Sequence, residues 1–525
     1  MKIFRPQSGF LAISFLIGCA FSAIGQQTDS GQSLADMARK LRKDTTDEVR
    51  MTDEDTKRLF ESVDRIFAFA AEDTGMPRHA TVKRRLVSKA DVEKYATGQM
   101  GKEEFAKSFA QEELSMKKLG FLPREFNLKE FLVKSTGQGV AAYYDPETKM
   151  VSMLNWVPAD RQEPILAHEL THALQDQNYN LTNWMKAGLK AADAKGGDSA
   201  MARKAVVEGQ AMVVYVDYLL QPAGRNLEDT PDLIYQMEDP AVKGTIDSQM
   251  MHDAPMILRE MGTFAYQGGL IFEGELLHKG GKKMAFAGVF ARPPRSSHEV
   301  LQPDAYINQE KLPPVRIPDM QALLAGQYDA YDSGGVGEVD IRALLKQYGE
   351  RKIADDLSSA WQGGAYVTYR RKETAMADVP ASTAELALLY ISYWKTAQAA
   401  ERFARFYAGS VSQRYRSAIV QEVQACSGTS CPVSIAQIVT EEGPVIVEHR
   451  KDAGNDNSVI VSEGFDTQTA SKLRTALRDR MGAAHAENLP QEEIGFRLLE
   501  IPAFRAFAEK IGKRVRDEMS RETGR

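Results

Sequence analysis

A short stretch, ILAHELTHALQDQNYN at residues 165–180, constrains this chain more than any other part of its sequence. It places His168 and His172 four residues apart, with Glu169 directly after the first histidine. Side chains four apart on an α-helix lie on one face, with Cβ atoms roughly 5–6 Å apart, so two imidazoles can converge on one metal ion. Apolar residues at helical spacing indicate an amphipathic helix here, expected over residues 160–178. A chance match is the alternative reading, which the low count of 8 histidines disfavours.

Glu169 lies beside the stripe formed by the two histidines rather than on it, so it is better placed as a general base than as a metal ligand. A zinc ion lowers the pKa of a bound water and polarises a carbonyl, while a neighbouring glutamate takes a proton from that water and returns it. The motif therefore predicts one Zn²⁺ per chain, bound by His168 and His172, with Glu169 as the catalytic residue.

A catalytic zinc also needs a third protein ligand, and Glu208 is the predicted one. It lies in an apolar helix expected at about residues 199–220. A carboxylate among apolar neighbours is costly to bury unless it is paired or binds a metal. The small residues Ala205, Gly209 and Ala211 would let this helix approach the histidine helix closely. A Glu208 that points to solvent is the alternative.

These residues resemble the gluzincin-type HExxH zinc metallopeptidases, in which two histidines and a downstream glutamate bind zinc. Within that type, the chain resembles a largely uncharacterised group of exported bacterial HExxH proteins, over roughly residues 131–306. One departure from that group is His298, which is followed by Gln302-Pro303 where relatives often show an acidic residue and His-Pro. The weaker shared segments are Tyr143 to Pro146, Val207-Glu208-Gly209 with Ala211, Phe264 with Tyr266, Gly268 and Gly269, and Pro293 to Ser296 with Val300, Leu301, Pro303 and Tyr306.

The resemblance implies a zincin-like fold with a small sheet beside the histidine helix. The hairpin strand at Met150 to Leu154 would run along the cleft as an edge strand, to which an extended peptide could add. Asp176 would orient His172 from a second shell, or else cap the helix end. Tyr266 or His298 would donate a hydrogen bond to the oxyanion, or else have structural roles.

The order of helical and strand-like segments predicts an α+β chain with several domains. Residues 328–340, YDAYDSGGVGEVD, are expected to form a solvated loop at a domain junction, and LALLYISYW at residues 386–394 fits either a helix or a strand. The predicted divisions are a signal peptide at 1–25, a helix-rich N-terminal region at 26–128, a zincin-like domain at 129–325 and a C-terminal α+β domain at 326–525.

The first residues have the pattern of a secretory signal peptide, with cations, an apolar run and a small-x-small site at Ala23-Ile24-Gly25. We therefore expect an exported protein, periplasmic or extracellular, with no transmembrane helix in the mature chain. Two alternatives stay open: release from the membrane, or a lipid anchor on Cys19. In an oxidising compartment, the close pair Cys426 and Cys431 is expected to form a disulfide.

The net charge of −6, with no long basic run, argues against a nucleic-acid partner. The main hypothesis is an exported zinc metallopeptidase that acts on peptides or proteins. The rival from another class is a catalytically inactive zincin-like scaffold that binds peptides or envelope components, and a zinc hydrolase of non-peptide amides is a third reading. The role of the N-terminal region is open, and a pro-segment is one of the alternatives.

Overall fold

The structure, a computed structural model, is of the α+β class, and its description covers the greater part of the chain. The predicted signal peptide, Cys19, Cys426 and Cys431 lie outside the described residues. The described residues are 51–88, 90–91, 103–131, 142–189, 196–231, 233–234, 253–312, 315–324, 326–349, 351–374, 382–425, 433–450 and 457–481.

A small sheet lies beside the histidine helix, in the strand order β1-β3-β2. Its strands are β1 (Lys83–Val87), β2 (Ala142–Asp145) and β3 (Met150–Leu154). The hairpin of β2 and β3 was predicted, but the placing of β3 at an edge is wrong. β1 pairs with the other side of β3 in parallel, so β3 is central. This pairing joins segments more than sixty residues apart, and no pattern within KRRLV, the sequence of β1, predicts it. Among the described residues, β2 is the edge strand nearest the histidine helix.

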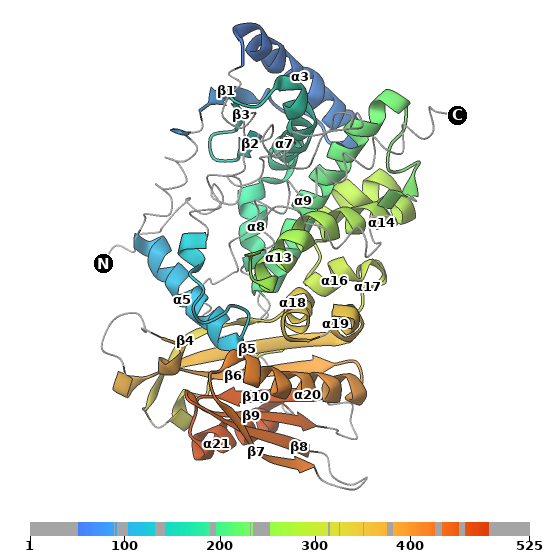
Figure 1. The fold of residues 1–525 in the computed structure, drawn as a ribbon. Helices are drawn as coiled ribbons and strands as arrows, with labels where there is room; N and C mark the ends of the chain where they lie inside the picture. Colours follow the sequence, from blue (N-terminus) through green and yellow to red (C-terminus); the bar gives the residue numbers. More distant parts are fainter. Residues whose placement is uncertain are drawn as a thin grey trace, which may run out of the picture.

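The two helices predicted to carry the site are present as α7 (Ala159–Tyr179) and α9 (Gly196–Leu220), which pack against each other. Helix α3 (Asp53–Thr74) packs on α7, and α14 (Gly269–Lys282) packs on α9 (Figure 1). The small residues of α9 were expected to allow close packing on α7, but Gly209 packs against another helix. A Cβ on Gly209 would lie 2.4 Å from the backbone of Gly269, so Gly209 admits α14 rather than α7.

The helical elements that surround α9 are mostly short, and two of them are π-helical. Their bounds are α8 (Leu181–Leu189), η1 (Gln221–Ala223), α13 (Met256–Thr263), the π-helical η2 (Phe264–Gly268) and η3 (Lys283–Gly288), α15 (Val289–Ala291), α16 (Ser297–Leu301) and α17 (Pro303–Ile307). The short helix η4 (Gln321–Leu324) lies in the C-terminal part instead, where it contacts the large sheet and its last helix.

The C-terminal part is built on a seven-stranded antiparallel sheet in the order β4-β5-β6-β10-β9-β8-β7. Helix α20 packs on one face and α21 on the other. The elements are β4 (Tyr328–Gly335), α18 (Glu338–Tyr348), α19 (Arg351–Ser358), β5 (Trp361–Arg371), η5 (Lys372–Thr374), η6 (Thr383–Glu385), β6 (Leu386–Trp394), α20 (Ala397–Arg414), β7 (Ala418–Ala425), β8 (Val433–Thr440), β9 (Gly443–Arg450), β10 (Ser458–Glu463) and α21 (Thr467–Met481).

The Asp- and Gly-rich stretch at 328–340 is not the predicted loop, because β4 and the start of α18 occupy it. An edge position tolerates residues that central strands avoid, and a bulge between Ala330 and Asp332 interrupts the pairing with β5. Asp332 is buried and accepts a hydrogen bond from the hydroxyl of Tyr366 at 2.9 Å, which offsets the cost of its burial. The segment at 386–394, which fitted either a helix or a strand, is the interior strand β6.

The N-terminal region contacts both parts of the molecule. Through β1 and α3 it completes the small sheet and covers α7. Through α5 (Glu103–Leu119) it reaches the large sheet, where the buried Lys118 ammonium lies 2.9 Å from the carboxylate of Glu442. Breaking one partner of such a buried pair typically costs about 3–5 kcal/mol. The described part of this region is therefore built into the fold (Figure 1).

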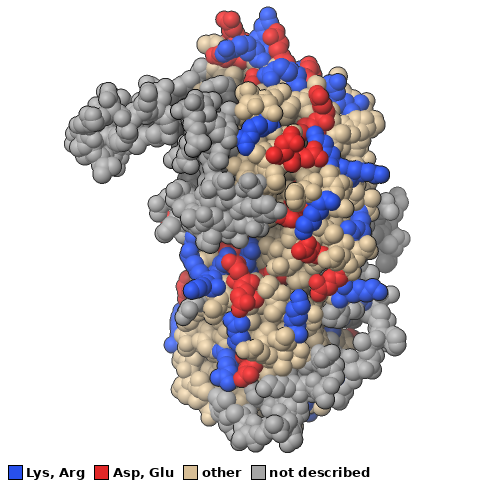
Figure 2. Space-filling model, turned by 90° about the vertical axis from the view of Figure 1, so that its right-hand side faces the viewer, with Lys and Arg blue, Asp and Glu red and all other residues tan. Residues whose placement is uncertain are grey.

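The surface of the described residues carries charges of both signs. On the face drawn in Figure 2, lysine and arginine side chains are interspersed with aspartate and glutamate, without a broad field of one sign. Among the described helices, none combines the length and the apolar character that crossing a membrane requires.

Candidate metal centre

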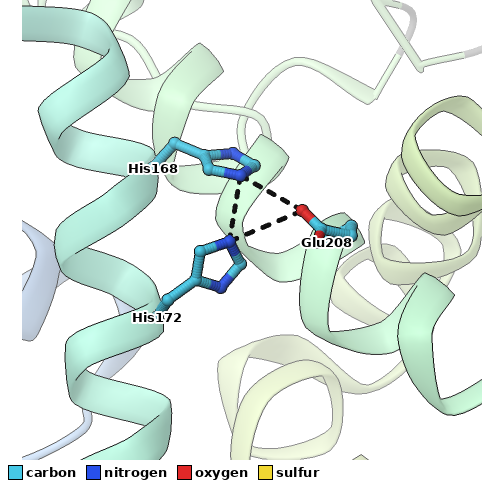
Figure 3. A group of neighbouring side chains, drawn as sticks. All are labelled: His168, His172 and Glu208. Atoms are coloured by element: carbon cyan, nitrogen blue, oxygen red, sulfur yellow. Dashed lines mark hydrogen bonds and ion pairs between the residues drawn. The ribbon is translucent and has the colours of Figure 1, made fainter. Parts of the chain in front are cut away.

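Three side chains from two helices converge at the centre of the site-bearing part. His168 and His172 project from α7, and Glu208 projects toward them from α9 (Figure 3). The two Nε2 atoms lie 3.0 Å apart, and Oε2 of Glu208 lies 3.2 Å from Nε2 of His168 and 3.5 Å from Nε2 of His172. Among the described residues, this is the group of three metal-ligand side chains close enough to hold one ion.

The spacing of these three atoms fits a tetrahedral metal ion. Zinc binds nitrogen at about 2.0–2.1 Å, so two ligands of a tetrahedral zinc lie about 3.3 Å apart. The three observed separations of 3.0, 3.2 and 3.5 Å bracket that value. His168, His172 and Glu208 are all buried, at 2%, 2% and 6% exposure. A buried carboxylate facing two imidazoles is a donor set that can hold a metal ion.

A chain of side-chain amides fixes which nitrogen of His172 carries its proton. Gln210 donates its Nε2 to the carbonyl oxygens of Ala285 and Phe286, at 2.7 and 3.1 Å. With its nitrogen placed in this way, the side-chain oxygen of Gln210 faces Gln175 and accepts a hydrogen bond from Nε2 of Gln175 at 2.9 Å. The remaining oxygen of Gln175 accepts from Nδ1 of His172 at 2.8 Å. His172 is therefore protonated at Nδ1, and its Nε2 presents a lone pair to the centre.

The electrostatics of the centre follow from burial and from mutual contact. Burial lowers the pKa of His168 to about 4. Burial also disfavours the charge on Glu208, but the two histidines outweigh it and hold the pKa of Glu208 below its ordinary range. For His172, burial again opposes the charge, but the carboxylate of Glu208 outweighs it and raises the pKa. The ligand set thus keeps its carboxylate ionised, in the form that binds metal.

Glu169 lies beside the three ligand side chains and is fixed by the small sheet. Its Oε2 accepts a hydrogen bond from the backbone N–H of Tyr144 in β2 at 2.9 Å. It is 5% exposed, and burial raises its pKa to about 8. A carboxyl group whose pKa lies near neutrality can both accept and release a proton at neutral pH.

Asp176 does not occupy the predicted position beside His172. Its Oδ2 accepts from the hydroxyl of Tyr144 at 2.8 Å and from the ammonium of Lys149 at 2.5 Å, and its Oδ1 accepts from the backbone N–H of Leu181 at 3.2 Å. The partner of His172 Nδ1 is Gln175, three residues further along the helix rather than four. Asp176 therefore ties α7 to the β2–β3 hairpin and to the start of α8, which matches the helix-end alternative.

The two candidate hydrogen-bond donors lie in different surroundings. Tyr266 is buried in the π-helical segment η2, with its ring centroid 6.4 Å from that of His168. π-Helical segments are frequent at functional sites. His298 is instead paired with the second part of the molecule, because its Nδ1 lies 2.5 Å from the carboxylate of Glu338 in α18. Of the two, Tyr266 is the one whose ring contacts that of a predicted ligand.

Sequence reasoning missed Gln175 and Gln210. Both side chains are fully buried, and Gln210 lies two residues after Glu208 in an apolar helix. The argument that singled out Glu208, a polar side chain that needs a partner, applies equally to Gln210. The sequence did not single out Gln175 in this way, because it lies among other polar residues, in LQDQN, and not on the apolar face assigned to the helix.

Comparison with known proteins gives a match over the C-terminal part of the chain. Residues 326–474 match a family model described as a domain of unknown function, DUF8575. The match covers the large sheet and leaves out His168, His172 and Glu208 on α7 and α9. No curated protein and no solved structure matches the chain.

Proposed function

We propose that this chain is an exported zinc-dependent metallopeptidase with a zincin-like site of the gluzincin type. His168, His172 and Glu208 bind the zinc ion, and Glu169 is the general base and acid. The observation that carries the proposal is the convergence of the three ligand atoms at separations of 3.0–3.5 Å beside a buried glutamate. Export rests on the predicted signal peptide.

When bound, zinc would polarise a peptide carbonyl and lower the pKa of a water molecule at the centre. Glu169 would accept a proton from the attacking water and deliver it to the leaving amine. The N–H of Tyr144 holds Oε2 of Glu169 in place at 2.9 Å, so the carboxylate is oriented before substrate arrives. The amide chain through Gln175 keeps Nε2 of His172 available to the metal.

The small sheet offers a place for an extended peptide. Because β3 is central, the peptide would pair with β2, whose outer side faces α7. The Tyr144 N–H points to Glu169 and away from β3, so this edge passes directly beside the general base. A peptide paired there by backbone hydrogen bonds would bring its carbonyl groups near the metal centre.

An inactive scaffold explains the site less well than a peptidase does. Binding a peptide at a sheet edge requires neither three converging metal ligands nor a proton acceptor. Glu169 occupies a buried position where a carboxylate is costly unless its charge or its proton is used. The scaffold remains a distinct outcome of the experiment.

The test is digestion of a diverse peptide mixture by the full chain loaded with zinc, with products read by mass spectrometry. We expect cuts at internal peptide bonds, loss of cutting when a chelator removes the metal, and recovery when zinc is restored. A folded protein that holds one zinc per chain and cuts nothing would support the scaffold instead.

The amide chain yields a prediction about metal affinity. Gln175→Leu removes the acceptor of His172 Nδ1 and should weaken zinc binding by about 10- to 100-fold, as loss of outer partners of metal-bound histidines does. Gln175→Glu keeps that acceptor and should lose less. Chelator competition measures both constants.

Gln177→Leu, on the same helix, is the matched control. Gln177 bonds the backbone of His79 and Ala80, away from the metal centre, so its loss should leave zinc affinity unchanged. Equal zinc affinities for Gln175→Leu and the native protein would contradict the role given to the amide chain.

A further inference from the structure

A cluster of buried charges joins the N-terminal region to the C-terminal part. This buried charge cluster consists of Lys118 in α5, Arg124 shortly after α5, Arg414 at the end of α20, Glu442 in the turn between β8 and β9, and Glu463 at the end of β10. The family model at residues 326–474 includes the last three and leaves out the first two. The cluster is therefore complete only when α5 lies against the large sheet (Figure 1).

Glu442 is held ionised by two cations of the cluster. Its carboxylate oxygens lie 2.9 Å from the ammonium of Lys118 and 2.8 Å from Nε of Arg124, and the hydroxyl of Thr383 donates to it at 2.7 Å. Burial opposes the charge on Glu442, but Lys118 and Arg124 outweigh it and lower its pKa to about 2. This carboxylate already has three donors.

Glu463 is surrounded by donors in the same way. Its carboxylate lies 2.9 Å from Nη2 of Arg414 and accepts hydrogen bonds from the hydroxyls of Tyr407 at 2.8 Å and Tyr415 at 2.6 Å. The side chains of Glu463 and Arg414 are completely buried. Each carboxylate of the cluster is thus engaged by three donors, and other N–H groups of the arginines are left over.

The two guanidinium groups of the cluster have buried nitrogens without an acceptor. Among the described residues, Nη2 of Arg124 and both Nε and Nη1 of Arg414 have no hydrogen-bond partner. Nε is explained by close packing, because a Cβ on Gly120 would lie 2.5 Å from it. Nη1 of Arg414 and Nη2 of Arg124 have no such explanation. Buried polar groups nearly always have a partner and an arginine cannot lose its charge, so these two nitrogens require an acceptor.

The same nitrogens lie in a region with an excess of positive charge. All three cations lie around the ring of Tyr415, whose centroid is 4.0 Å from Cζ of Arg124, 5.6 Å from Cζ of Arg414 and 5.9 Å from Nζ of Lys118. The face of an aromatic ring attracts cations, which offsets part of the cost of burying them. Three cations still face two carboxylates, so the cluster keeps one positive charge. Burial lowers the pKa of Lys118, and an anion nearby would favour its ammonium form.

We propose that the buried charge cluster binds one small monovalent anion of the chloride class, held by Nη1 of Arg414 and Nη2 of Arg124. One such ion balances the charge of the cluster and accepts the hydrogen bonds that the two carboxylates leave unmade. The ion is small, because the side chains of Lys118 and Arg414 are completely buried. Its binding secures α5 on the large sheet. The inference goes beyond the proposed peptidase function and does not rest on it.

The test measures unfolding of the full chain by urea in sodium chloride and in sodium gluconate at equal ionic strength. Gluconate is too large for a buried site of this kind, so charge screening is matched and only the bound ion differs. An ion that binds the folded chain alone raises its stability as the ion concentration rises. We expect the midpoint to shift to higher urea in chloride, by an amount that grows with chloride concentration, and bromide to act as chloride does.

Bromide also locates the ion. Crystals of the full chain grown in sodium bromide should show an anomalous scattering peak at hydrogen-bonding distance from Nη1 of Arg414 and Nη2 of Arg124.

Arg124→Gln removes one of the two donors and one positive charge. A hydrogen bond to a charged group contributes about 1.5–3 kcal/mol, so anion binding should weaken by about 10- to 100-fold and the shift in chloride should be lost. Arg402→Gln is the matched control on α20. Arg402 pairs with Asp356 at 2.9 Å and its side chain is 40% exposed, so this variant should keep the native shift.

Equal urea midpoints for the native chain in chloride and gluconate would overturn the inference. A chloride shift that survives in a folded Arg124→Gln would do so too, as would bromide peaks only at other positions. If Arg124→Gln does not fold, the presence or absence of the bromide peak in the native crystals decides. None of these measurements depends on peptide cleavage, so failure of the proposed function would leave the inference standing.

Discussion

Glu169→Gln is expected to abolish turnover while zinc stays bound. The amide has nearly the shape of the carboxylate and its oxygen can still accept from the N–H of Tyr144, so the local structure is retained. It cannot accept a proton from water, and loss of a general base typically costs about 100- to 10,000-fold in rate. The measurement is kcat with a peptide found in the mixture digest, together with the zinc content of the purified variant.

The matched control is Glu163→Gln, the same substitution near the start of the same helix. Glu163 pairs with Arg65 at 2.9 Å and accepts from Tyr218 at 2.7 Å, so its role is to hold α3 and α9 against α7. Its loss should leave kcat nearly unchanged. If Glu169→Gln turned over at the native rate, Glu169 would not be the base, whatever the metal content.

The second large effect is expected on metal binding, from loss of Glu208. Glu208→Ala removes the anionic ligand of the three and leaves two histidines on one helix. Loss of a residue that hydrogen-bonds a metal ligand lowers metal affinity by up to about 100-fold. Loss of a ligand itself should lower zinc affinity by more than that, with a parallel loss of activity. Glu208→Gln keeps the volume but not the charge, and should fall nearly as far. Metal content after dialysis and chelator competition measure both variants.

Glu275→Ala provides the comparison for that experiment. Glu275 is a glutamate on α14 that forms an ion pair with Lys279, 3.3 Å away and four residues later, and it should bind zinc as the native chain does. Retention of one zinc per chain at native affinity in Glu208→Ala would remove Glu208 from the ligand set. The proposed function would then need another third ligand.

Local pattern was sufficient for the long elements of this chain. The bounds of α7 and α9 lie within three residues of the predicted ones, because helical periodicity extends over five or more turns in each. In the C-terminal part, the strand-like runs YVTYR, PVIVEHR and SVIVSEG lie in β5, β9 and β10. The secondary structure of short segments was predicted less well. The stretch at 328–340 has the composition of a loop, yet β4 forms there because β5 offers a partner edge.

The same division holds at the candidate metal centre. His168 and His172 could be paired from sequence because their spacing within one helix sets their separation. Glu208 could be named because a carboxylate in an apolar helix needs a partner, although its distance from the histidines needed the packing of α9 on α7. The choice between Gln175 and Asp176 as partner of His172 depended on what each could reach outside α7. Gln175 donates a hydrogen bond to Gln210, whereas Asp176 accepts hydrogen bonds from Tyr144 and Lys149.

The sequence by itself determined that two histidines and a glutamate stand together on one helix, since helix geometry is local and repeats every few residues. It also determined the α+β class, through the order of its periodic segments. Only the tertiary structure decided that β1 pairs beside β3, that Gly209 admits α14, and that an amide chain holds His172. These contacts join residues distant in the chain, and their energies depend on which surfaces the whole fold brings together, which no local pattern records.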